Sequence, residues 1–145
     1  ITIRRSTFFD NTNGENFFYL HGALEPKIGK IVSIVKTSKK DSAEIGKKIA
    51  MHISAMSPMG LEEKSLSAEV VSKEIEIIKA ELLNSGKQPE MIEKISKGKI
   101  NKFISDNTLL NQIWIMDPKK KVSDVLKEND IKIVDFIRYK VGEGV

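Results

Sequence analysis

Two histidines, His21 and His52, are the side chains best suited to proton transfer in this chain, because an imidazole titrates near neutral pH. No positioned acid accompanies His52, and His21 has no visible partner for holding a metal. Adjacent glutamates, Glu62 and Glu63, diverge in an extended segment, which argues against a paired-carboxylate site. Gly142-x-Gly144 lacks the third glycine and the following helix of a dinucleotide loop, so a turn is the better interpretation. We therefore expect no catalytic residue, cofactor site or metal site, and no enzyme.

His52 has a second interpretation as a contact for a partner protein. It shares a helical stripe with Ile49 and Met56, so it belongs at the edge of a core face or at a contact aided by its neighbour Met51. Proton transfer is the third alternative. His21 is expected in a loop or edge position. Met51, His52 and His21 are the candidate partner contacts.

The composition is that of a soluble globular domain and excludes several classes of protein. The 145 residues are 40% hydrophobic and 30% charged, with no cysteine and no apolar run near the ~20 residues of a membrane span. This excludes disulfide scaffolds and thiolate zinc sites, and it favours a reducing, cytosol-like compartment. The chain starts at Ile1 without a methionine, so we expect a fragment of a longer protein.

The net charge of +4 does not by itself indicate a nucleic-acid partner. Only three of the 24 basic residues are arginines, and base-edge recognition depends on the paired donors of arginine. Many lysines also lie three or four residues from a glutamate, which is typical of a solvated helix face. The run Lys119–Lys121 is a loop before a helix or, alternatively, a phosphate contact. The charge pattern thus argues against nucleic-acid binding.

Three β-favouring stretches open the chain and predict an antiparallel sheet. They cover residues 1–9, 17–20 and 29–35, and Asn/Gly and Gly/Pro clusters separate them. The apolar period then becomes helical up to Pro58, with Asp41 as a candidate cap. This predicts an amphipathic helix at about residues 41–57.

Two long helical patterns follow and predict an antiparallel hairpin at about residues 67–108. Ser67 can cap the first helix, Gly86 suits its C-terminal end, and Pro89 suits the start of the second helix. The first helix carries a heptad-like apolar seam, formed by Val71, Ile75, Ile78 and Leu82. Because each stripe is narrow, the hairpin could protrude from the body of the protein.

The last part of the chain returns to mixed structure. Residues 109–116 are predicted to be extended and contain Trp114, which is either a packing residue or an interface anchor. A short helix is expected at 123–128. From Ile131 the odd positions are apolar, with Asp135 as the exception, which predicts a half-buried strand.

These patterns predict an α+β fold. An antiparallel sheet would have helices packed on one face and a protruding antiparallel helical hairpin. Residues 1–66 and 109–145 would form the core, and residues 67–108 the hairpin.

Several stretches, in this order and spacing, resemble elongation factor Ts. They include Ile3-Arg4-Arg5, His21-Gly22, Ile49 to Ala55, Ser67 to Glu74, and Phe136 to Gly144. The resemblance implies a guanine nucleotide exchange factor for elongation factor Tu, acting in translation elongation by protein–protein docking without covalent chemistry. It also implies that the hairpin is a coiled-coil or dimerisation excursion and that the helix bearing His52 belongs to the docking core.

Two departures from the family limit what the resemblance implies. The family's exchange element lies around a Thr-Asp-Phe-Val motif, which this sequence lacks, and the family's N-terminal helical module is also missing. We therefore expect weak binding to elongation factor Tu and little acceleration of nucleotide release. The alternatives are a self-associating hairpin scaffold or, less favoured, a lysine-rich RNA-binding module.

Overall fold

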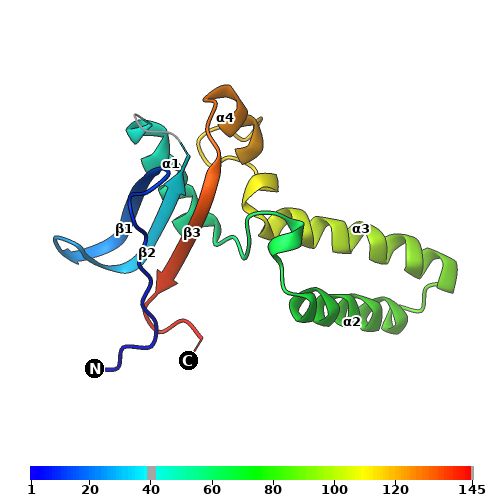
Figure 1. Ribbon diagram of the computed structural model, residues 1–145. Coiled ribbons are helices and arrows are strands. Elements are labelled where there is room, and N and C mark those ends of the chain that lie inside the picture. The colour runs from blue at the N-terminus through cyan, green and yellow to red at the C-terminus, as the bar shows by residue number, and fades with distance from the viewer. Residues whose placement is uncertain (39–41, 145) are drawn as a thin grey trace. The chain divides into compact units, whose positions relative to one another are not determined.

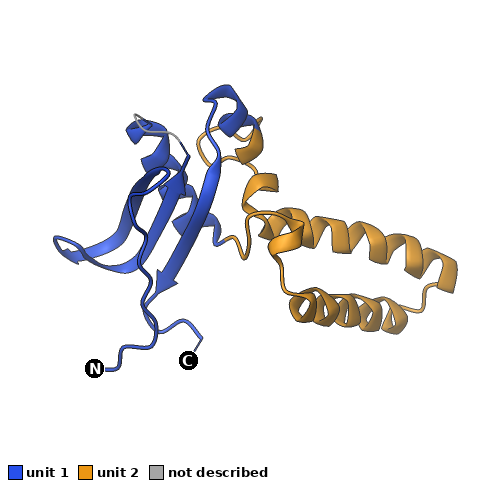
Figure 2. Ribbon diagram, viewed as in Figure 1, with its two compact units in different colours: residues 1–57, 124–145 blue, residues 58–123 orange. Residues whose placement is uncertain are grey.

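The computed structural model describes residues 1–38 and 42–144 and divides the chain into two units (Figure 2). Unit 1 combines Ile1–Ser57 with Asp124–Val145, and unit 2 is the intervening Pro58–Ser123. Segments from both ends of the chain therefore build unit 1.

Unit 1 is organised by a three-stranded antiparallel sheet of order β1-β2-β3 (Figure 1). The strands are β1 (Glu15–Glu25), β2 (Ile28–Thr37) and β3 (Ile133–Lys140). A tight turn joins β1 to β2, and its Lys27 has a φ of +71°. β3 comes from the far end of the chain and pairs with the central strand β2, so the α+β class is confirmed.

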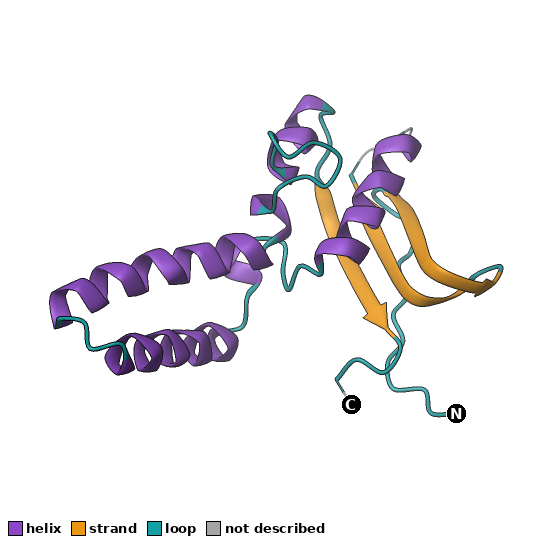
Figure 3. Ribbon diagram, turned by 180° about the vertical axis from the view of Figure 1, so that it is seen from behind, coloured by secondary structure: helices purple, strands orange, loops and turns teal. Residues whose placement is uncertain are grey.

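Helix α1 (Ala43–Met56) covers one face of this sheet (Figure 3). Phe17 lies directly beneath Gly46, and the Ser33 hydroxyl donates a 2.5 Å hydrogen bond to the carbonyl of Ala50. The helix predicted at about 41–57 is thus confirmed. Ser42 occupies its N-cap position, and the candidate cap Asp41 lies outside the described residues.

The strand register shows which side chains share the face under α1. Phe17 pairs with Val35, which pairs with Phe136, while a bulge between Lys36 and Thr37 brings Ile133 to the same side. The apolar odd positions 137 and 139 consequently lie on the opposite face. The predicted strand exists, but its alternation does not mark one buried side.

Two sequence predictions of extended structure are wrong. Residues 1–14, all described, form no strand, because their backbone does not join the sheet ladder. Residues 109–116 contain the 3₁₀ turn η2 (Leu109–Asn111), a single bridge residue and a turn. Strand β1 is longer than predicted, so His21 lies within a strand and not in a loop.

Unit 2 contains helices α2 (Ala68–Asn84) and α3 (Pro89–Asn107), which pack antiparallel. The Ser67 side chain accepts from the amide of Val70, Gly86 has a φ of +71°, and Pro89 begins α3, all as predicted. At the base, the amide of Leu109 donates to the carbonyl of Gly60. The hairpin is therefore present, and its protrusion from the body stays a prediction.

Two short helical elements complete the described structure. The 3₁₀ turn η1 (Glu63–Ser65) precedes α2, and α4 (Val122–Glu128) spans the boundary between the units. The short helix predicted at 123–128 is confirmed. Within the described part of the chain, no helix combines the length and apolarity needed to cross a bilayer.

Candidate protein-docking surface

The C-terminal end of α1 is fixed to the sheet by a small polar network. The Ser33 and Ser54 hydroxyls are 2.9 Å apart, and the Nε of Arg138 donates a 3.1 Å hydrogen bond to the carbonyl of Ser54. Arg138 also donates from its Nη1 to Glu143 at 3.0 Å. The last turn of α1 contains no basic residue, so Arg138 supplies from β3 the cation that favours a helix C-terminus.

Sequence reasoning missed this role of Arg138. The odd positions of the predicted strand are the apolar ones, so alternation predicts Arg138 on the polar side, whereas the structure places it on the α1 face with its side chain 11% exposed. The one available signal was its type. It is one of three arginines in a lysine-rich chain, and only arginine presents a planar set of donors to two acceptors.

Met51 and His52 occupy the middle of α1, where they differ in exposure. His52 is fully buried, at 0% exposure, while Met51 is half-buried. The imidazole therefore belongs to the interior, and the neighbouring Met51 offers apolar surface to solvent. A direct contact between His52 and a partner would require this part of α1 to move.

His21 lies on the edge strand β1 and is exposed. Its ring centroid is 6.4 Å from that of Tyr19, which lies opposite Ser33 in the ladder. Because Ser33 contacts Ala50 and Ser54, His21 lies on the α1 side, toward the C-terminal end of the helix. Met51 and His21 thus share one side of unit 1.

Lysine–carboxylate ion pairs neutralise charge in unit 1 both on α1 and on the face of the sheet away from α1. The Lys36 ammonium lies 2.7 Å from Asp10 and, with hydrogen bonds from Thr12, lowers the pKa of that carboxyl to about 2. Lys48 similarly lowers the pKa of Glu44, its neighbour one turn back on α1. Both carboxylates are therefore charged at neutral pH and neutralise the adjacent lysines.

In unit 2, Trp114 and the lysine run 119–121 both make backbone hydrogen bonds within one loop. Trp114 is buried at 5% exposure, and its amide donates to the carbonyl of Lys120. The amide of Lys119 donates to the carboxylate of Asp117. Burial of the indole supports the packing interpretation of Trp114.

Among the described residues, no group of three His, Cys, Asp or Glu side chains is placed to hold a metal ion. What unit 1 does present is a structured surface around α1, with an exposed histidine and a half-buried methionine.

A family model described as Elongation factor TS matches residues 1–143. The chain belongs to the elongation factor Ts family. Elongation factor Ts of Methylococcus capsulatus is 39% identical over 145 residues, covering 100% of this chain and 47% of the relative. The relative from Nitratiruptor sp. is 44% identical over 137 residues, covering 88% of this chain and 44% of the relative.

The chain spans about half the length of the curated elongation factor Ts sequences it matches. The proteins from Legionella pneumophila strain Lens and Acinetobacter baylyi show the same proportion, with 41% and 46% of their lengths matched. The family match covers both units, so the sheet and the hairpin belong to one segment of the elongation factor Ts family.

Proposed function

We propose that this chain carries part of the surface by which an elongation factor Ts docks on the GTPase elongation factor Tu and promotes release of GDP. The observation that carries the proposal is the family match over residues 1–143. The mechanism is thermodynamic linkage. If binding of the exchange factor lowers the affinity of the GTPase for nucleotide, bound nucleotide lowers the affinity of the GTPase for the exchange factor by the same factor. No covalent step is involved, and the protein would act in the cytoplasm or in a bacterium-derived organelle.

The contact surface in this proposal is the side of unit 1 that carries α1. Met51 and His21 would contact the GTPase directly, because both reach solvent on that side. His52 is buried beneath this surface, so we assign it the positioning of α1 and its neighbour Met51. The polar network of Ser33, Ser54 and Arg138 holds the same helix on the sheet.

In this proposal the chain binds elongation factor Tu but accelerates nucleotide exchange only slightly. The family's exchange element surrounds a Thr-Asp-Phe-Val motif, and this sequence contains none. Docking alone would leave the nucleotide site mostly undisturbed. We therefore expect measurable affinity for nucleotide-free elongation factor Tu with slow release of GDP.

The test uses elongation factor Tu loaded with fluorescent GDP and compares this chain with intact elongation factor Ts of Methylococcus capsulatus. The chain should compete with the intact factor for the GTPase while releasing nucleotide much more slowly. Met51→Asp should weaken competition at least tenfold, and Met91→Asp, an exposed methionine on α3, should not. Release as fast as with the intact factor, or equal effects of both variants, would contradict the proposal.

A second candidate function is self-association through the hairpin. Its support is the apolar surface that α2 and α3 leave exposed, which includes Ile77, Leu83 and Met91. Coiled-coil helices bury such side chains against a partner helix. Sedimentation of the wild type and of the Ile75→Asp variant tests self-association. If the wild type is a dimer and the variant is a monomer whose unit 1 is still folded, association through the hairpin is supported. A monomeric wild type excludes it.

A further inference from the structure

Asn13 and Gly14 form an asparagine–glycine pair in the loop between the N-terminal segment (residues 5–10) and β1. The side chain of Asn13 is exposed, and its backbone is left-handed, with a φ of +56°. Asparagine is one of the few residues besides glycine that adopts this conformation at little cost. The backbone of the loop therefore favours asparagine at this position.

Gly14 is fixed by a close contact with the neighbouring strand β2. It is buried, and a Cβ atom added to it would lie 2.1 Å from the carbonyl oxygen of Thr37. Any side chain at this position would force the loop away from the strand, so the close approach requires glycine. The fold thus places a residue without a side chain directly after an exposed asparagine.

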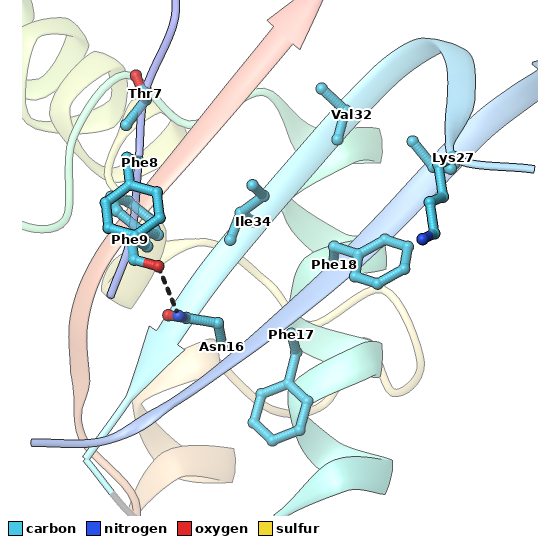
Figure 4. Close-up of a pocket in the computed structure, with 10 residues that line it drawn as sticks. Thr7, Phe8, Phe9, Asn16, Phe17, Phe18, Lys27, Val32 and Ile34 are labelled. Atoms are coloured by element: carbon cyan, nitrogen blue, oxygen red, sulfur yellow. Dashed lines mark hydrogen bonds between the residues drawn. The ribbon is translucent and has the colours of Figure 1, made fainter. Parts of the chain in front are cut away.

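Hydrogen bonds hold the loop beside this pair but not at the pair itself. The Asn16 carboxamide donates to the carbonyl of Phe9, as Figure 4 shows, and to the carbonyl of Asp10 at 2.8 Å. Within the residues that the structure describes, the Asn13 carboxamide has no hydrogen-bond partner and the Gly14 amide has no acceptor. Both groups are therefore free to meet each other.

We propose that Asn13 is a site of spontaneous deamidation in the folded chain, with solvent water as the co-reactant. The backbone nitrogen of Gly14 attacks the side-chain Cγ of Asn13 and forms a C–N bond, while the bond from Cγ to the amide nitrogen breaks. The proton of the glycine nitrogen leaves with the amide as ammonia, so a succinimide ring remains. Water then opens either carbonyl of the ring, which gives aspartate or, where the main chain continues through Cγ, isoaspartate.

Other exposed asparagines lack the features that favour this ring closure. Asn84 precedes Ser85, whose side chain obstructs attack and whose amide donates to the carbonyl of Glu81 at 3.2 Å. Asn101 lies inside α3, where the amide that follows it belongs to the hydrogen-bond ladder of the helix. Both are internal controls, because they are asparagines of the same chain and are also exposed.

Deamidation would change both the charge and the length of the loop. Either product adds a carboxylate three residues from Asp10, whose own carboxylate lies 2.7 Å from the Lys36 ammonium. Isoaspartate also inserts one methylene into the main chain, next to a glycine that is fixed against Thr37. Partly exposed ion pairs hold a segment only weakly. We therefore expect the modified loop to release the N-terminal segment from the sheet, a change that is independent of any contact with the GTPase.

Ageing of the purified chain at neutral and at mildly alkaline pH tests this inference. Peptide mass spectrometry reads, at each asparagine, the mass gain that replaces the amide by a carboxylate. Asn13 should be modified at least tenfold faster than Asn84 and Asn101, faster at alkaline pH, and with isoaspartate among the products. Equal rates at the three asparagines would overturn the inference.

The same measurement in guanidinium chloride separates the fold from the dipeptide. The rate at Asn13 in the folded chain should stay within threefold of its rate in the unfolded chain. A folded rate more than tenfold lower would show that the fold protects the pair, and would overturn the inference.

A variant without the carboxamide tests the consequence for the N-terminal segment. Asn13→Gly cannot form the ring and accepts the left-handed backbone, so it is the matched unreactive control. Tryptic cleavage after Arg5 should accelerate at least threefold as the wild type ages and should stay constant in Asn13→Gly. Equal acceleration in both chains would contradict release of the segment by deamidation.

Discussion

The backbone of Gly46 lies against the ring of Phe17, so closely that a Cβ atom on Gly46 would come within 2.1 Å of the ring. This contact joins the first half of α1 to β1 and brings helix and sheet together. Glycine is unfavourable inside a helix, so its presence here reflects the need for close approach. The sequence pattern that predicted α1 contained no indication of this contact.

Gly46→Ala should therefore destabilise unit 1. Overpacking costs about 1–3 kcal/mol, against a helix-propensity gain of about 1 kcal/mol from removing a glycine. Gly98→Ala in α3 is the matched control, because an added Cβ there meets nothing within 4 Å. It should stabilise unit 2 by about 0.5–1 kcal/mol. Urea unfolding with hydrogen exchange resolved by unit measures both, and a stabilising Gly46→Ala would contradict the contact.

Arg138 should contribute measurably to the stability of unit 1. Its Nε satisfies the carbonyl of Ser54, one of the last four carbonyls of α1, which lack partners within the helix. Arg138→Met removes this charged donor and should cost about 1–3 kcal/mol in the free energy of unfolding. Glu143→Gln, which weakens only the partly exposed ion pair, should cost less than about 1 kcal/mol. If both variants lose the same stability in thermal unfolding, the hydrogen bond from Arg138 to Ser54 is not the main contribution of Arg138.

The N-terminal segment should loosen in acid. The pKa of Asp10 is lowered to about 2 from 3.8, so its pairing with Lys36 stabilises the folded state above pH 3.8 and is lost as pH falls toward 2. A carboxyl ¹³C titration should show the low pKa, and Lys36→Met should return it toward 3.8. An unchanged titration in Lys36→Met would refute the pairing.

Ser67 should determine where α2 begins. Its side chain accepts from the amide of Val70, so Ser67→Ala should cost about 1 kcal/mol of hairpin stability and fray the first turn. Ser72→Ala, within the same helix and exposed, lacks a capping position and should be nearly neutral. Amide exchange at Val70 and Val71 distinguishes the two. Unchanged protection in Ser67→Ala would contradict the capping role.

Local signals predicted the hairpin well. The cap at Ser67, the left-handed Gly86 and Pro89 at the start of α3 each act within a few residues, so the sequence alone contains their physical cause. The family was also evident from residue order. The protrusion of the hairpin and the contact roles of Met51, His52 and His21 stay predictions.

Only the tertiary structure shows which face of the sheet packs against α1. Apolar residues line both faces, so alternation in β3 could not indicate which side meets α1, and the bulge beside Thr37 moves Ile133 to the side of Phe136. Residues 1–9 have β-favouring types but form no strand, because strand formation depends on packing against cross-strand neighbours, which residue types alone do not provide. The sequence thus determined the helical elements by short-range sterics and capping. Burial of His52 and the bond from Arg138 to Ser54 depend on contacts between distant residues, and only the folded chain brings them together.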